Sequence, residues 1–156
     1  MIHANTVPYT HVISKSEVII TQELKKTFQM SEPAGSSIMK LVRLRSLDEE
    51  PVIVETDYLP DQLRLIMEMD LENKSLYGLI YEKMGIKPAN ISDRFHIVRA
   101  TAVLAEYLNV PKNHPLLSVT QNVLDEQGNV IYYNEQIIKT ESYEYTVESF
   151  SGSANS

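Results

Sequence analysis

Two arginines and a glutamate stand in otherwise apolar stretches near the middle of the chain. Arg43 and Arg45 lie in LVRLRSL, and Glu55 follows PVIV a few residues later. A guanidinium group donates hydrogen bonds in a planar fork that suits a carboxylate or a phosphate, most strongly where water is excluded. These residues could therefore bind a small anion. The alternative is that Glu55 simply neutralises Arg43 in a structural ion pair.

The two stretches predict an antiparallel β-hairpin. On a strand, Arg43 and Arg45 point to the same face, because side chains alternate. If residues 48–50 form a three-residue loop, Glu55 lies directly opposite Arg43. A two-residue loop would turn Glu55 to the other face, since a one-residue slip inverts every side chain. The predicted shared cavity depends on this loop.

Composition indicates one soluble domain. The chain has 156 residues, of which 43% are hydrophobic and 22% charged, enough for one real core. A net charge of −7 without a basic stripe disfavours nucleic-acid binding by this surface. The absence of cysteine excludes disulfide and thiolate chemistry, and no apolar run reaches membrane-spanning length. We expect a cytoplasmic protein that has no membrane partner.

Hydrophobic periodicity predicts an α+β domain in which helices segregate from antiparallel strands. Strands are expected at residues 11–20, 37–47, 51–59, 90–100, 115–124, 130–140 and, as a last edge strand, 142–150. Helices are expected at residues 22–30, 61–69, 76–84 and 102–108, three of them capped by Thr21, Ser75 and Thr101. Residues 1–7 are expected to be a disordered or artificial start, and residues 151–156 a flexible tail.

The order of RLR, PVIVETDYLP, SLYGLIYEKMGI, ATAVLAEYLNV and HPLLSVTQNVLDEQGNVIYYNEQ resembles the UTRA ligand-sensing domain over residues 8–150. That domain is the C-terminal half of HutC-type transcription regulators in the GntR family. The resemblance implies a curved antiparallel sheet flanked by helices, similar to chorismate lyase, with a small-molecule pocket and a homodimer. It also implies a preceding winged helix-turn-helix domain. No basic recognition-helix pattern precedes Thr10, so contact with DNA is expected only through that absent domain.

The resemblance and the residues themselves together give eight candidate ligand contacts. They are Arg43, Arg45, Glu55, Ser75, Tyr77, Asp93, Glu135 and Tyr143. Ser75 has a sufficient role as a helix cap, yet a helix N-terminus can also hold a phosphate. Tyr77 could equally be a partly buried core aromatic.

Asp93 and Glu135 are carboxylates on strand faces that otherwise carry apolar residues, so each needs a polar partner. The resemblance matches Glu135 to a position that binds ligand hydroxyls. Carboxylates that accept from hydroxyls, together with arginines that donate to an anion, suit a polyol bearing one acidic group. A sugar phosphate or amino-sugar phosphate fits this description best.

The sequence contains no motif that predicts a catalytic site or a metal site. Four histidines are scattered without metal-ligand spacing, and no nucleophile motif or glycine-rich phosphate loop is present. We expect no metal, no cofactor and no enzymatic activity. Two alternatives stay open: a lyase-like enzyme on the same fold, in which Arg43 and Arg45 bind an aromatic carboxylate and a glutamate transfers a proton, or a ligand-free dimerisation module.

Overall fold

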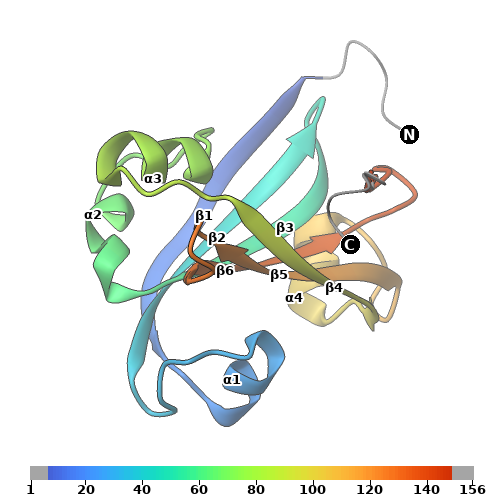
Figure 1. Ribbon diagram of the computed structural model, residues 1–156. Coiled ribbons are helices and arrows are strands. Elements are labelled where there is room, and N and C mark those ends of the chain that lie inside the picture. Colours follow the sequence, from blue (N-terminus) through green and yellow to red (C-terminus); the bar gives the residue numbers. More distant parts are fainter. Residues whose placement is uncertain (1–6, 149–156) are drawn as a thin grey trace.

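Alternating apolar side chains build one strongly twisted six-stranded antiparallel sheet in the computed structural model, which describes residues 7–148 (Figure 1). The spatial order of its strands is β1-β2-β3-β6-β5-β4. The strands are β1 (Pro8–Ile19), β2 (Ser37–Leu47), β3 (Glu50–Leu59), β4 (Asn90–Arg99), β5 (Pro115–Leu124) and β6 (Val130–Ile138). The predicted α+β class with a curved antiparallel sheet is confirmed.

The helices begin where the sequence supplies a capping side chain. They are α1 (Gln22–Phe28), the 3₁₀ turn η1 (Asp61–Leu63), α2 (Arg64–Met67), α3 (Leu76–Met84) and α4 (Ala102–Leu108). The hydroxyls of Thr21, Ser75 and Thr101 each accept a hydrogen bond from a backbone N–H in the first turn, as predicted. Gly85 ends α3 in the left-handed region, with a φ of 68°, a conformation that glycine adopts without steric strain.

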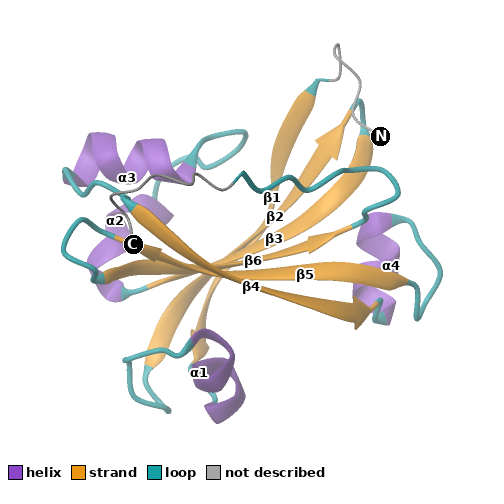
Figure 2. Cartoon of the chain, turned by 45° about the vertical axis from the view of Figure 1, so that its right-hand side comes forward, coloured by secondary structure: helices purple, strands orange, loops and turns teal. Residues whose placement is uncertain are grey.

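The two faces of the sheet carry different helices (Figure 2). The front face bears Leu41, Leu59 and Tyr132, which pack under α2 and α3. The back face packs against α1 through a cluster around Tyr133 and against α4 through a cluster around Ile137. Polar side chains that interrupt the front face therefore lie close to α3.

The β2–β3 hairpin has the predicted pairing of Arg43 with Glu55, but its turn differs from the predicted one. Its turn consists of only Asp48 and Glu49, whose φ angles of 50° and 67° are those of a type I′ turn. A bulge at Val52 then shifts the pairing by one residue, so that Arg43 lies opposite Glu55. The predicted three-residue loop is wrong, and the predicted placement of Arg43 and Glu55 on one face is confirmed.

Replacing Glu49 with glycine is expected to stabilise the domain by about 0.5–1 kcal/mol, because a side chain at positive φ is strained. The matched control is Gly128→Ala in the β5–β6 turn, where a φ of 83° makes a Cβ unfavourable. This control should destabilise by a similar amount. Urea denaturation measures both changes. A Glu49→Gly variant no more stable than the parent would contradict the inference that the backbone of Glu49 is strained.

Residues 141–148 form no helix or strand, so the predicted edge strand at 142–150 is wrong over its described part. The reason is that Tyr143 and Tyr145 pack on an apolar cluster of the front face instead of continuing the sheet. The ring of Tyr145 meets that of Phe95 edge to face, with centroids 6.0 Å apart. β4 is an outer strand of the sheet. The predictions for 1–7 and 151–156 lie outside the described residues, apart from Val7.

Candidate ligand-binding site

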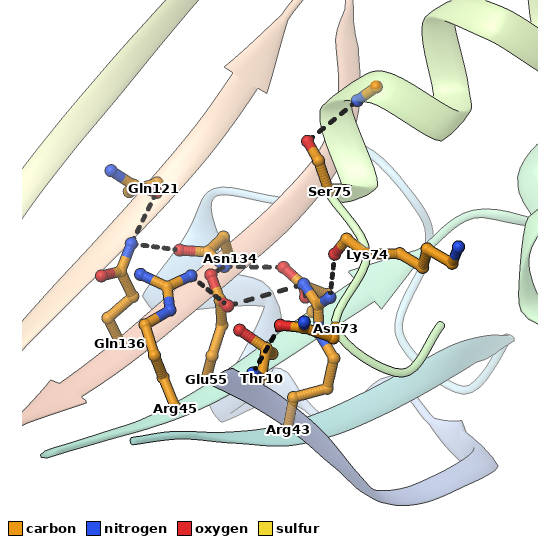
Figure 3. A network of polar contacts seen from close by, with 12 residues as sticks. Thr10, Arg43, Arg45, Glu55, Asn73, Lys74, Ser75, Gln121, Asn134 and Gln136 are labelled. Atoms are coloured by element: carbon orange, nitrogen blue, oxygen red, sulfur yellow. Dashed lines mark hydrogen bonds and ion pairs between the residues drawn. The ribbon is translucent and has the colours of Figure 1, made fainter. Parts of the chain in front are cut away.

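A cavity of about 860 Å³ opens on the front face, between the sheet and the loop that precedes α3. Its floor is polar because four adjacent strands place charged or amide side chains there (Figure 3). These floor residues are Arg43, Arg45, Glu55, Asp57, Gln121, Asn134 and Gln136. Such a concave site with converging polar groups is typical of small-molecule binding.

Arg43 is held almost entirely by the protein itself. Only 3% of the residue is exposed. Its Nη1 donates to the carbonyl of Lys74 at 2.8 Å, while Nη2 lies 3.5 Å from Glu55 Oε1 and 3.4 Å from Asp57 Oδ2. Arg43 therefore ties the loop before α3 to the sheet and neutralises two buried carboxylates.

Asp57 is fully buried beneath the cavity floor. Burial, and next the neighbouring charge of Glu55, raise the pKa of Asp57 to about 7, although Arg43 and a hydrogen bond from Asn134 oppose this. Asn134 Nδ2 donates to Asp57 at 2.6 Å and to Glu55 at 2.9 Å. Near neutral pH the charge beneath the cavity therefore depends on whether the Asp57 carboxyl group is protonated.

Arg45 is a cation on the cavity floor that remains accessible from the cavity. Its side chain is 29% exposed, and Nη2 donates to Glu55 Oε1 at 2.9 Å. A guanidinium group has five N–H donors, so this one ion pair leaves donors for a ligand. Arg45, rather than the enclosed Arg43, is placed to hold an incoming anion.

The first turn of α3 forms another wall of the cavity. Ser75 Oγ accepts from the N–H of Gly78 at 3.1 Å, and both Ser75 and Tyr77 line the cavity. Burial raises the pKa of Tyr77 to about 12, so its hydroxyl remains a donor at neutral pH. The helix N-terminus adds a partial positive charge, which favours a phosphate or carboxylate near these residues.

The cavity collects six of the eight predicted site residues: Arg43, Arg45, Glu55, Ser75, Tyr77 and Tyr143. Asp93 lies beside it and accepts from the Gln121 amide at 2.9 Å. Glu135 is placed differently from the prediction. It lies on the back face, in a separate hollow with Lys40 and Tyr58, because its neighbours Asn134 and Gln136 are the residues of β6 that face the cavity.

Four residues of the cavity floor were not predicted. Asp57 could have been found, because it lies two residues after Glu55 on the same strand and so shares its face. The amides of Gln121, Asn134 and Gln136 carry no such signal, since amide side chains are equally common on solvated faces. Within residues 7–148, no group of three or more metal-ligating side chains forms, and no helix there is long and apolar enough to span a membrane.

Glu72 anchors the loop before α3 to β1. It accepts hydrogen bonds from the Val12 N–H at 2.8 Å and the Tyr9 hydroxyl at 2.9 Å, and it lies 2.7 Å from His11 Nδ1. The backbone hydrogen bond of Val12, followed by the contact with His11, lowers the pKa of Glu72 to about 2. A depressed pKa stabilises the folded state above the unfolded value near 4.5, and this is lost as the pH falls toward 2.

The variant Glu72→Gln is therefore expected to melt at a lower temperature than the parent at pH 7, because it replaces the charged acceptor. The difference should shrink as the pH falls below about 4.5, since the unfolded parent then takes up a proton that its folded state, with a pKa of about 2 for Glu72, does not bind. Thermal unfolding followed by circular dichroism between pH 7 and pH 3 measures this. A difference that stays constant over this range would contradict the role of the Glu72 charge.

Comparison with known proteins identifies the family. The UTRA domain model matches residues 3–144. The transcriptional regulator GgaR of Escherichia coli K12 is 27% identical over 141 residues, which are 90% of this chain and 55% of that protein. A Shigella flexneri protein named "Probable fructoselysine utilization operon transcriptional repressor" is 22% identical over 140 residues, 86% of this chain and 58% of that protein. The chain thus spans little more than half the length of these relatives.

Solved structures share the fold. The effector domain of PhnF from Mycobacterium smegmatis superposes with a TM-score of 0.78 at 19% identity, over 94% of this chain and 89% of that one. A GntR-family regulator from Bacillus cereus gives a TM-score of 0.71 at 19% identity, over 92% of this chain and 99% of that one. Because the UTRA domain model matches most of its length, the chain belongs to the UTRA domain family.

Proposed function

We propose that the front-face cavity binds a small anionic metabolite, and that a sugar phosphate or amino-sugar phosphate fits its lining best. The observation that carries this proposal is the position of Arg45. Its guanidinium group forms one ion pair, with Glu55, and is accessible from the cavity, whereas Arg43 lies deeper and is already paired. Ser75 and Tyr77 at the start of α3 support an anion from the opposite wall.

The rest of the lining suits a polyol. The amides of Gln121, Asn134 and Gln136 offer both donors and acceptors, and Glu55 can accept from a hydroxyl. One relative is named as a repressor of a fructoselysine utilization operon, which also favours a sugar-derived ligand. The role is sensing rather than catalysis.

In an intact, cytoplasmic regulator, binding would shift the equilibrium between arrangements of a dimer and so alter DNA binding by a separate winged helix-turn-helix domain. A coupling free energy of about 1–3 kcal/mol between the ligand and DNA sites changes affinity by roughly 5- to 150-fold. That is sufficient for regulation.

A thermal-shift panel tests the proposal. It compares hexose and hexosamine 6-phosphates with their parent sugars, inorganic phosphate and aromatic carboxylates. A ligand that binds only the folded state must raise the melting temperature with its concentration. We expect the largest shifts from the phosphorylated sugars. A stronger response to aromatic carboxylates, accompanied by their turnover, would instead support a lyase-like enzyme.

A further inference from the structure

Polar side chains form a straight row across the cavity floor. The strand register sets Asp57 of β3 opposite Asn134 of β6, and it sets Asn134 opposite Gln121 of β5. Gln121 in turn lies opposite Asp93 of β4. Gln136, two residues after Asn134 on the same face of β6, lies beside both amides. The row therefore places two amides between two carboxylates, with a third amide next to them.

The carboxylates fix which way the two amides of the row point, because an ionised carboxylate only accepts hydrogen bonds. At one end Asp93 Oδ1 accepts from Gln121 Nε2 at 2.9 Å. At the other end Asn134 Nδ2 donates to Asp57 at 2.6 Å and to Glu55 at 2.9 Å. Glu55 holds Asn134 in this orientation even when Asp57 is protonated. Each amide oxygen is thereby turned away from its carboxylate.

Gln136 completes the network with its amide nitrogen. Its Nε2 donates to Gln121 Oε1 at 3.4 Å and to Asn134 Oδ1 at 3.3 Å (Figure 3). Gln121 Nε2 also donates to the hydroxyl oxygen of Tyr145, 3.4 Å away. Each amide nitrogen carries two hydrogens and has two acceptors, so within the described part of the chain these three amides have no free donor.

The floor amides consequently meet a ligand with oxygens alone, although an amide in general has donors as well. Gln136 lines the cavity and is partly exposed, and its Oε1 has no hydrogen-bond partner among residues 7–148. A hydroxyl or amino group of a ligand can donate to this oxygen. A ligand group that only accepts, such as an ether oxygen, would leave it unpaired, which is unfavourable in a partly closed site. Arg45 supplies donors on the same floor.

We propose that Asp93 is a positioning residue that orients the floor amides so that Gln136 meets the ligand with its oxygen. The cavity therefore selects ligands that carry a hydroxyl or amino donor in addition to their anionic group. Asp93 lies beside the cavity and not in its lining, so it acts through Gln121 rather than by contact with the ligand. The selection rests on the proposed function, whereas the orientation of the amides is a property of the unliganded chain.

Hydrogen exchange of side-chain amides, followed by NMR on the unliganded chain, tests the orientation. The amide protons of Gln121 and Gln136 should exchange about tenfold more slowly than those of the exposed Gln62. Asp93→Asn should reduce the protection of both glutamines, because its amide can donate as well as accept and no longer fixes Gln121. The matched control Asp61→Asn, on an exposed ion pair with Arg64, should leave it unchanged.

Circular dichroism establishes that each variant is folded. Exchange of Gln121 and Gln136 as fast as that of Gln62, or protection that is the same in Asp93→Asn as in the parent, would overturn the orientation.

Calorimetric titration with glucose 6-phosphate and its monofluoro analogues tests the selection. Each analogue replaces one ring hydroxyl with fluorine, which is of similar size but has no proton to donate. The parent should bind at least one analogue about tenfold more weakly than glucose 6-phosphate. Glucosamine 6-phosphate, in which an amino group replaces a hydroxyl, shows which of the two donors binds more tightly.

The preference for the hydroxyl should decline in both Asp93→Asn and Gln136→Met, and it should persist in Asp61→Asn. Equal affinities for glucose 6-phosphate and all its fluoro analogues, or a preference that survives Asp93→Asn, would overturn the selection. If none of these phosphates binds, the proposed function fails together with the selection, whereas the exchange measurement still decides the orientation of the amides.

Discussion

Replacing Arg43 with methionine is expected to destabilise the folded domain by about 3–5 kcal/mol. The substitution leaves Asp57 buried without the cation that neutralises it and leaves Glu55 paired with Arg45 alone, and it removes the hydrogen bond to the carbonyl of Lys74. Urea denaturation at pH 7.5 measures the loss. The matched control is the double variant Arg43→Met with Asp57→Asn, which removes the unpaired carboxylate of Asp57. It should recover part of the stability, whereas additive losses would contradict a shared network.

The same network makes the stability depend on pH. The pKa of Asp57 is about 7 in the folded chain and 3.8 without perturbation, so the folded state binds this proton more tightly. Its contribution therefore favours folding at low pH and declines as the pH rises through 7. Arg43 lowers this pKa, so its removal should extend the decline to a higher pH and enlarge the loss at pH 8. Denaturation of both proteins at pH 5.5 and 8 measures the slopes, and a smaller deficit of Arg43→Met at pH 8 than at pH 5.5 would contradict this.

Arg45→Gln is expected to weaken the binding of a phosphorylated sugar by about 100-fold, because a charge-assisted contact in a partly closed cavity is lost. The fold should lose less than about 1 kcal/mol, since this side chain is still in contact with solvent. Arg45→Lys keeps the charge but not the planar fork, so we expect an intermediate loss of about tenfold.

Glu135→Gln supplies the matched control for the binding experiment. Its side chain lies on the back face, away from the cavity, so the affinity should be the same as that of the parent. Isothermal titration calorimetry on the four proteins separates the effects. A loss of affinity in Glu135→Gln as large as that in Arg45→Gln would show that the ligand occupies a different place.

The hairpin shows how far the sequence leads and where it stops. The pattern of apolar residues predicted both strands, whereas the facing of Arg43 and Glu55 was predicted only with a three-residue loop, which the family resemblance favoured. It did not reveal that a two-residue turn and a bulge at Val52 combine to give that register. A bulge leaves no composition signal here, since valine is an ordinary strand residue.

The second hairpin and the C-terminal segment show a different limit. Alternation established that Glu135 and its neighbours point to opposite faces, but not which face bears the cavity. That choice depends on where α3 and its loop lie, which is a property of the whole fold. Likewise, Tyr143 and Tyr145 have high strand propensity, yet their rings gain more by packing on the front face.

The most direct test of the account is a calorimetric titration of the unmodified chain with the phosphorylated sugar that gives the largest thermal shift, and with the same sugar lacking its phosphate. The account predicts that the phosphorylated compound binds at least tenfold more tightly, and that Arg45→Gln abolishes most of this difference. Equal affinities for the two compounds, or a preference for phosphate that survives Arg45→Gln, would contradict it.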